Sequence, residues 1–213
     1  MSTPESYYVP VDAGEAEFTE KRSRFLGHVR RVETEAEARA FLDEMRKKYY
    51  DARHNCWCYV LHDGGVVRYG DDGEPQGTAG QPMLNVFQRE GVENVVCVVT
   101  RYFGGVLLGA GGLTRAYAKS AKDALDAAGK ARMRLWSAVT VECPYPMLER
   151  LKLLAAAHSG MVEGTDFGAA VGVHILLPQE NTAGFDAALT ELSAGSLSAR
   201  RDGERFLPGA REA

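Results

Sequence analysis

VVCVVTRYFGGVLLGAGGLTRAYAKSAKDAL, residues 95–125, places a β-branched run, a glycine-rich loop and a helical pattern one after another. The run at residues 95–100 predicts a buried strand. The glycines that follow at residues 104–112 allow the backbone to approach a ligand closely. A helix N-terminus presents unpaired N–H groups and a partial positive charge, so this order of elements favours an anion-binding site.

The helix that we expect from Leu113 onward has two distinct sides. At about 100° per residue, its apolar side comprises Leu113, Ala116, Tyr117, Ala121, Ala124, Leu125 and Ala128. Arg115, Lys119 and Lys122 lie on the opposite side. A cation near a helix N-terminus opposes the helix dipole, and a bound anion would offset that cost. The alternative is a solvated polar face after an ordinary glycine turn. The GxxxxGK[ST] and GxGxxG motifs are absent.

The charge of the chain is unevenly distributed. Of its 213 residues, 45% are hydrophobic and 25% are charged, which is typical of a globular protein. The net charge of −4 argues against general polyanion binding, and residues 136–213 supply all of it. Residues 1–135 contain 19 basic and 19 acidic residues. Any attraction for nucleic acid must therefore be local and come from the N-terminal part.

Hydropathy and cysteine usage indicate a cytoplasmic protein without membrane association. No apolar run approaches the length of a membrane span, and MSTPESYYVPVD lacks the features of a secretory signal. Because the cytosol keeps thiols reduced, the four cysteines (Cys56, Cys58, Cys97 and Cys143) are predicted to be small core residues. His54, Cys56 and Cys58 alternate along a strand, too far apart for one tetrahedral zinc, so we predict no metal site.

Two further segments are candidates for function. Residues 70–82, GDDGEPQGTAGQP, form a long loop that presents Asp71, Asp72 and Glu74 to a metal or a donor group, or else a solvated turn. In the strand expected at residues 52–62, the face with Trp57 and Tyr59 is either a base-stacking platform or part of the core. We favour core packing for that face.

The other elements follow from periodicity and turn signals. In the N-terminal part we expect strands at residues 7–11, 17–32 (bent at Gly27) and 66–69, helices at 34–49 and 82–90, and a basic connector at 130–134. The remainder predicts strands at 135–143, 161–167, 170–177 and 197–206 and helices at 146–158 and 182–194. This β-α-β-β-α-β order is the ferredoxin-like pattern.

Three blocks give the chain a specific resemblance. DDGEPQGTAG (71–80), VVTRYFGG (98–105) and LGAGGLTRAY (108–117) resemble the signature blocks of the YigZ/IMPACT family, in the same order. EKRSRF (20–25) and DARHNCW (51–57) lie where that family has matching segments. The C-terminal part resembles the accessory domain of bacterial members, which is similar to domain five of elongation factor G.

The resemblance implies a fold and a general role. It implies an α+β protein: an α/β sandwich at 1–135, like the second domain of ribosomal protein S-five, followed by a small ferredoxin-like domain at 136–213. It also implies a link to translation, because eukaryotic IMPACT members regulate translation initiation. Only the domain transfers to a bacterial protein, and fold alone confers no activity.

We therefore expect a binding or regulatory protein that engages RNA or ribosome-associated factors without a cofactor. A homo-oligomer is an assembly that the sequence allows. The alternatives are an enzyme acting on a small phosphorylated or carboxylated compound, and a protein-interaction module. The candidate ligand-binding residues are Lys21, Ser23, Arg24, His54, Asp71, Asp72, Glu74, Thr78, Arg101, Tyr102, Gly104, Gly105, Gly109, Gly111, Gly112, Arg115 and Lys119. No catalytic residue is assigned.

Overall fold

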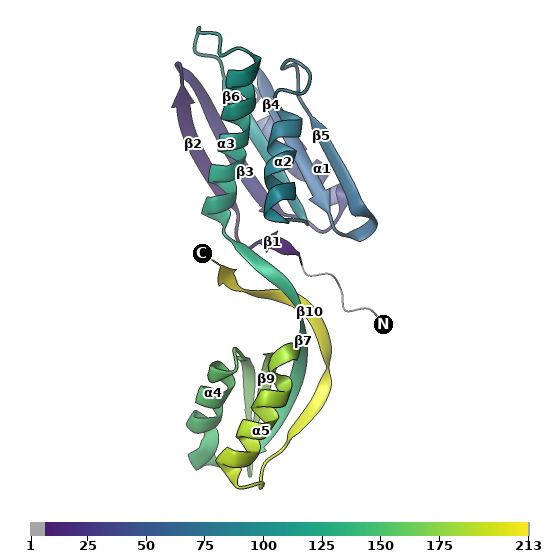
Figure 1. Cartoon of the computed structure of the whole chain (residues 1–213), viewed down its shortest axis with the longest axis vertical. Coiled ribbons are helices and arrows are strands. Elements are labelled where there is room, and N and C mark those ends of the chain that lie inside the picture. The colour runs from purple at the N-terminus through teal and green to yellow at the C-terminus, as the bar shows by residue number, and fades with distance from the viewer. Residues whose placement is uncertain (1–6, 213) are drawn as a thin grey trace. The chain divides into compact units, whose positions relative to one another are not determined.

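The computed structural model describes residues 7–212, which form an α+β fold (Figure 1). Contacts divide the chain into two compact units. Within the described residues, the first unit comprises residues 7–132 together with the segment that begins at Pro208, and the second unit is Met133–Leu207. The chain thus leaves the first unit and returns to it. Independent domains at 1–135 and 136–213 remain our proposal.

The first unit is built on an antiparallel sheet with the strand order β2-β3-β6-β4-β5. Its strands are β2 (Gly14–Glu20), β3 (Ser23–Arg31), β4 (His54–Leu61), β5 (Val66–Gly70) and β6 (Val95–Tyr102). A short strand β1 (Tyr8–Pro10) pairs with the start of β7 (Lys130–Cys143). The valine-rich β6 is the middle strand and is buried along almost its whole length, as its sequence predicts.

Helices cover both faces of this sheet (Figure 1). Helices α2 (Gly80–Glu90) and α3 (Ala110–Ala128) pack on one face, and α1 (Glu35–Lys48) packs on the other. Strand β4 joins the two cores: Cys56 and Cys58 point toward α2 and α3, whereas Tyr59 and Leu61 pack with α1. Core packing of the Trp57 and Tyr59 face is therefore confirmed.

Several other predictions are confirmed in detail. The seven residues predicted to form the apolar side of α3 are all buried. The four cysteines are free and buried. The hydroxyl oxygen of Thr34 accepts a hydrogen bond of 3.2 Å from the N–H of Glu37, which caps α1. No helix within residues 7–212 is long and apolar enough to cross a membrane.

Three predicted boundaries are wrong. The segment at 17–32 is a hairpin of β2 and β3 rather than one bent strand, and its turn residues Lys21 and Arg22 have φ of 45° and 68°. Helix α3 begins at Ala110 rather than at Leu113, because Gly111 and Gly112 adopt helical backbone. The predicted connector at 130–134 is the beginning of β7, which pairs with β1.

The second unit has the predicted ferredoxin-like order. After β7 come α4 (Leu148–Ala157), β8 (Met161–Phe167), β9 (Val171–Pro178), α5 (Thr182–Ser193) and β10 (Ala199–Glu212). The strand order is β10-β7-β9-β8, and the core lies between this sheet and the two helices. Short 3-10 helices occupy Asp63–Gly65, Tyr145–Met147 and Gln179–Asn181. Toward its end β10 enters the first unit, where the Arg211 guanidinium donates to the carbonyl of Ala127 at 3.2 Å.

Candidate functional site

The β2–β3 turn, the loop at 103–109 and the first turns of α3 meet at one end of the first sheet. Gly104 makes the closest of these approaches. A Cβ atom at this position would lie 2.0 Å from the carbonyl carbon of Arg22, so only glycine fits there. The N–H of Gly104 donates to the Ser23 hydroxyl oxygen at 3.2 Å. The glycine loop therefore holds the Lys21–Arg22 turn in place.

We expect Gly104→Ala to displace the β2–β3 turn and to lower the free energy of unfolding by about 1–3 kcal/mol, because the added methyl group meets backbone atoms. Urea unfolding followed by circular dichroism measures this cost. Gly111→Ala is the matched control. It lies in the first turn of α3, where a Cβ meets only the Arg115 guanidinium at 3.5 Å, and alanine favours the helix. Equal effects of the two substitutions would contradict the role of Gly104.

A buried ion pair lies behind this turn. The Arg101 guanidinium donates to the Glu74 carboxylate at 2.7 Å, and their side chains are only 6% and 4% exposed. The Tyr117 hydroxyl donates to the same carboxylate oxygen at 2.8 Å, and burial raises the pKa of Tyr117. A second guanidinium nitrogen of Arg101 donates to the Ser23 hydroxyl oxygen at 3.3 Å. Arg101 and Glu74 thus neutralise each other and position Ser23.

The acidic loop at 70–82 is closed by its own hydrogen bonds. The Asp71 carboxylate accepts from the N–H groups of Gly77, Ala79 and Gly80 at 2.7–3.0 Å and so caps α2. The Asp72 carboxylate accepts from the N–H of Asn55 at 2.7 Å.

Neighbouring side chains complete the closure of this loop. The His54 Nδ1–H donates to the Asp72 carbonyl at 2.8 Å, and the Thr78 hydroxyl donates to the Pro75 carbonyl at 2.6 Å. The Cys56 thiol donates to the Asp71 carbonyl, and burial raises the pKa of Cys56. Across residues 7–212, no group of three or more His, Cys, Asp and Glu side chains is arranged to hold a metal ion.

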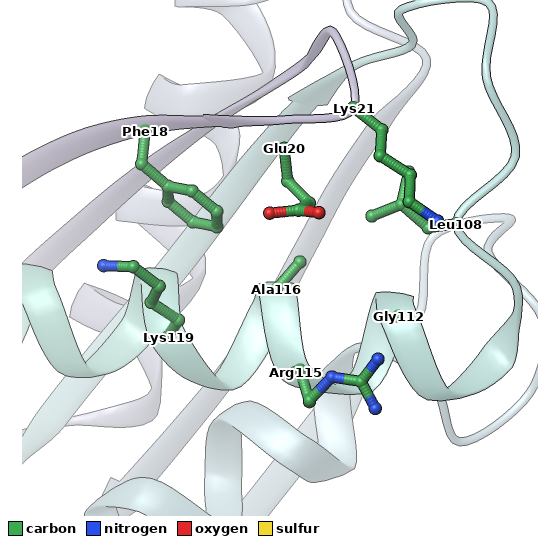
Figure 2. Close-up of a pocket in the computed structure, with 8 residues that line it drawn as sticks. All are labelled: Phe18, Glu20, Lys21, Leu108, Gly112, Arg115, Ala116 and Lys119. Atoms are coloured by element: carbon green, nitrogen blue, oxygen red, sulfur yellow. The ribbon is translucent and has the colours of Figure 1, made fainter.

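A shallow pocket of about 150 Å³ opens between β2 and α3. It is lined by Phe18, Glu20, Lys21, Leu108, Gly112, Arg115, Ala116 and Lys119. Figure 2 shows Glu20 projecting from β2 toward Ala116, with Lys21 and Leu108 on one side and Phe18 and Lys119 on the other. The pocket thus combines cations from two elements with apolar side chains and one carboxylate.

The cations of this pocket differ in how they are neutralised. Lys119 pairs with Asp123 one turn along α3, and its ammonium lies 4.9 Å from the centre of the Phe18 ring. Lys21 and Arg115 form no ion pair within residues 7–212. The N-cap of α3 is Gly109, which has no capping side chain, whereas the start of α2 is capped by Asp71. An anion placed here would meet uncompensated positive charge.

The structure distributes the candidate residues among three environments. Lys21, Gly112, Arg115 and Lys119 line the pocket; Ser23, Glu74 and Arg101 form the buried cluster; His54, Asp71, Asp72 and Thr78 close the acidic loop. Gly104, Gly105, Gly109 and Gly111 shape the loop and the helix start.

Arg24 and Tyr102 lie outside these environments. Arg24 pairs with Glu17, and the Tyr102 hydroxyl donates to Asp51, with burial raising the pKa of Tyr102 to about 12.

The candidate residues omit Phe18, Glu20, Leu108 and Ala116, which also line the pocket. Phe18 and Glu20 are two residues apart on β2 and so share one face of the strand. Once the hairpin is recognised, this alternation places both side chains beside α3. The missing signal was therefore the turn at Lys21 and Arg22.

Comparisons with known proteins identify two matching domain models. The Impact N-terminal domain matches residues 21–125, and a domain of unknown function, DUF1949, matches residues 141–196. The first match includes the turn, the acidic loop, the glycine loop and most of α3. All pocket-lining residues except Phe18 and Glu20 fall within it.

Relatives of similar length extend the likeness over most of the chain. IMPACT family member YvyE of Bacillus subtilis is 36% identical over 89% of this chain and 88% of its own length. IMPACT family member YigZ of Escherichia coli is 35% identical over 91% of this chain and 96% of its own length. A crystal structure described as that of a hypothetical protein is 34% identical, with a TM-score of 0.58, and covers 92% of this chain and 96% of its own.

Proposed function

The chain belongs to the IMPACT family, and on that premise we propose that it is a regulatory protein that binds single-stranded RNA of the translation machinery. The RNA-binding surface in this proposal is the pocket between β2 and α3 with the adjoining loop at 103–109. Eukaryotic relatives at 32–38% identity carry the name IMPACT, and they match 43–51% of this chain.

The observation that carries the proposal is the convergence of Lys21 and Arg115 from separate elements on one pocket, where neither forms an ion pair within residues 7–212. Phosphate groups of a nucleic acid would supply the missing negative charge. Because residues 1–135 contain equal numbers of basic and acidic residues, the attraction must be local. This agrees with a chain of net charge −4.

The size of the pocket favours one unit of a polymer over an enclosed metabolite. Sites for small molecules typically have about 300–1,000 Å³, whereas this pocket has about 150 Å³. The adjoining loop exposes Phe103, Val106 and Leu107, with fractions of 44%, 39% and 82%. Exposed aromatic and apolar side chains beside cations are the features on which single-stranded bases stack.

The carboxylates of Asp71, Asp72 and Glu74 accept hydrogen bonds from the protein itself, which favours binding over acid–base chemistry at the acidic loop.

We expect the double variant Lys21→Gln/Arg115→Gln to bind single-stranded RNA roughly tenfold to a hundredfold more weakly, because weaker neutral hydrogen bonds replace two charge-assisted hydrogen bonds to phosphate. Fluorescence anisotropy with a labelled RNA, repeated over a series of salt concentrations, measures the effect. The log–log salt slope should decrease by about 0.7 for each phosphate contact removed.

Arg46→Gln/Lys47→Gln is the matched control. It removes the same charge from the exposed last turn of α1, on the opposite face of the sheet. The control should bind RNA almost as well as the unchanged chain. The proposal fails if the unchanged chain shows no association at low salt, in anisotropy and in co-sedimentation with ribosomes, or if both double variants lose affinity equally.

A further inference from the structure

Glu20 is an unusual member of a pocket for an anion. Among the eight residues that line the pocket it is the only acid, and its carboxylate projects toward α3 (Figure 2). Within residues 7–212 it forms no ion pair, although Lys21, Arg115 and Lys119 line the same pocket. A carboxylate in this position repels phosphate, so it lowers affinity for any ligand that offers it no hydrogen bond.

The chemistry of an ionised carboxylate restricts which ligand suits the pocket. It only accepts hydrogen bonds, so the ligand must present a donor beside its anionic group. A phosphodiester has no donor, and the sugar of DNA within a strand has none either. The sugar of RNA carries the 2′-hydroxyl group, which is both donor and acceptor and distinguishes RNA from DNA.

We propose that the pocket takes one ribonucleotide unit, with its phosphate toward Lys21 and Arg115 and its 2′-hydroxyl donating to Glu20. This inference rests on the proposed binding of RNA and specifies how the same site selects RNA over DNA. Cations and carboxylate have separate tasks: Lys21 and Arg115 attract either nucleic acid, and Glu20 penalises the one that lacks a 2′-hydroxyl. Phe18 and Leu108 supply apolar contact for the sugar.

The geometry of the strand supports this separation of tasks. Glu20 is the last residue of β2 and pairs with Ser23 across the hairpin. Ser23 is fully buried and held by Gly104 and Arg101. The carboxylate therefore extends from a turn that is fixed by the buried cluster, so the end of β2 that carries it is positioned relative to α3 before a ligand arrives.

The test compares three labelled oligonucleotides of one sequence by fluorescence anisotropy at low salt: RNA, DNA and 2′-O-methyl RNA. The full chain should bind RNA roughly tenfold to a hundredfold more tightly than DNA or 2′-O-methyl RNA, because one hydrogen bond to a charged group contributes about that factor to affinity. Glu20→Ala should remove most of this preference, chiefly by improving the binding of DNA. Glu15→Ala is the matched control, since Glu15 is an exposed residue of the same strand that does not line the pocket.

The outcomes separate this inference from the function on which it rests. If neither RNA nor DNA binds, both fail. If RNA and DNA bind equally well, or if 2′-O-methyl RNA binds as RNA does, the proposed binding stands and the role of Glu20 is overturned. A preference for RNA that survives in Glu20→Ala also overturns it, because the 2′-hydroxyl is then recognised elsewhere.

Discussion

Replacing Arg101 by methionine is expected to lower the free energy of unfolding by about 3–5 kcal/mol, the usual cost of removing one partner from a buried ion pair. The Glu74 carboxylate would keep only the Tyr117 hydroxyl as a donor, in a side chain that is 4% exposed. The Ser23 hydroxyl would lose the guanidinium as well. Because Ser23 supports the β2–β3 turn, the pocket should be disturbed together with the core.

Urea unfolding followed by far-ultraviolet circular dichroism measures this loss. The double variant Arg101→Met/Glu74→Gln should recover a large part of it, because no uncompensated charge then remains buried. Arg24→Met is the control: its pair with Glu17 is exposed at the surface, and it should change stability little. If Arg101→Met lowered the free energy of unfolding as little as Arg24→Met, the buried ion pair would not be important for stability.

The second large effect is expected for Asp71→Ala, at about 3 kcal/mol. The substitution removes the cap of α2 and a further hydrogen bond to a charged acceptor, which together are worth about that much. The N–H groups of Gly77, Ala79 and Gly80 would lose their shared acceptor. Gly80 is the first residue of α2 and Ala79 is its N-cap, so the acidic loop and the helix start should loosen together.

Hydrogen exchange at Ala79 and Gly80 tests this prediction locally, alongside urea unfolding. Asp71→Asn keeps an acceptor oxygen and should give an intermediate result. Asp63→Ala, in the exposed turn after β4, is the control and should leave both measurements nearly unchanged. Unaltered exchange in Asp71→Ala would show that the carboxylate does not hold the loop.

Elements with strong periodicity could be predicted from the sequence. Every residue predicted for the apolar side of α3 is buried, because a long amphipathic helix leaves a clear pattern. Alternation along β4 likewise separates the Cys56 and Cys58 side from the Tyr59 side, and these sides do pack into different cores. The element order of the second unit follows from the same patterns.

The hairpin was missed for a physical reason. Left-handed turn positions usually reveal themselves as glycine or asparagine, but Lys21 and Arg22 occupy them here. Tertiary contacts support the turn instead, namely the close approach of Gly104 and the hydrogen bonds of Ser23. A pattern within residues 17–32 does not contain that information.

The environments of the candidate residues could not be predicted from the sequence either. Glu74 meets Arg101 and Tyr117 across 27 and 43 residues of sequence, and Ser23 meets Arg101 across 78. The acidic block at 71–74 resembles an open ligand site in sequence, whereas folding directs its carboxylates inward to protein donors. Only the fold distinguishes acids that serve the structure from an acid such as Glu20 that faces a pocket.

The return of the chain to the first unit has a consequence during synthesis. Arg211 donates to the Ala127 carbonyl at the end of α3, yet it leaves the ribosome some eighty residues after that helix. A nascent chain must therefore hold most of the first unit together without this strand while the second unit emerges. Domains usually fold in order from the N-terminus. Here the first unit is completed only after the whole of the second unit has been synthesised.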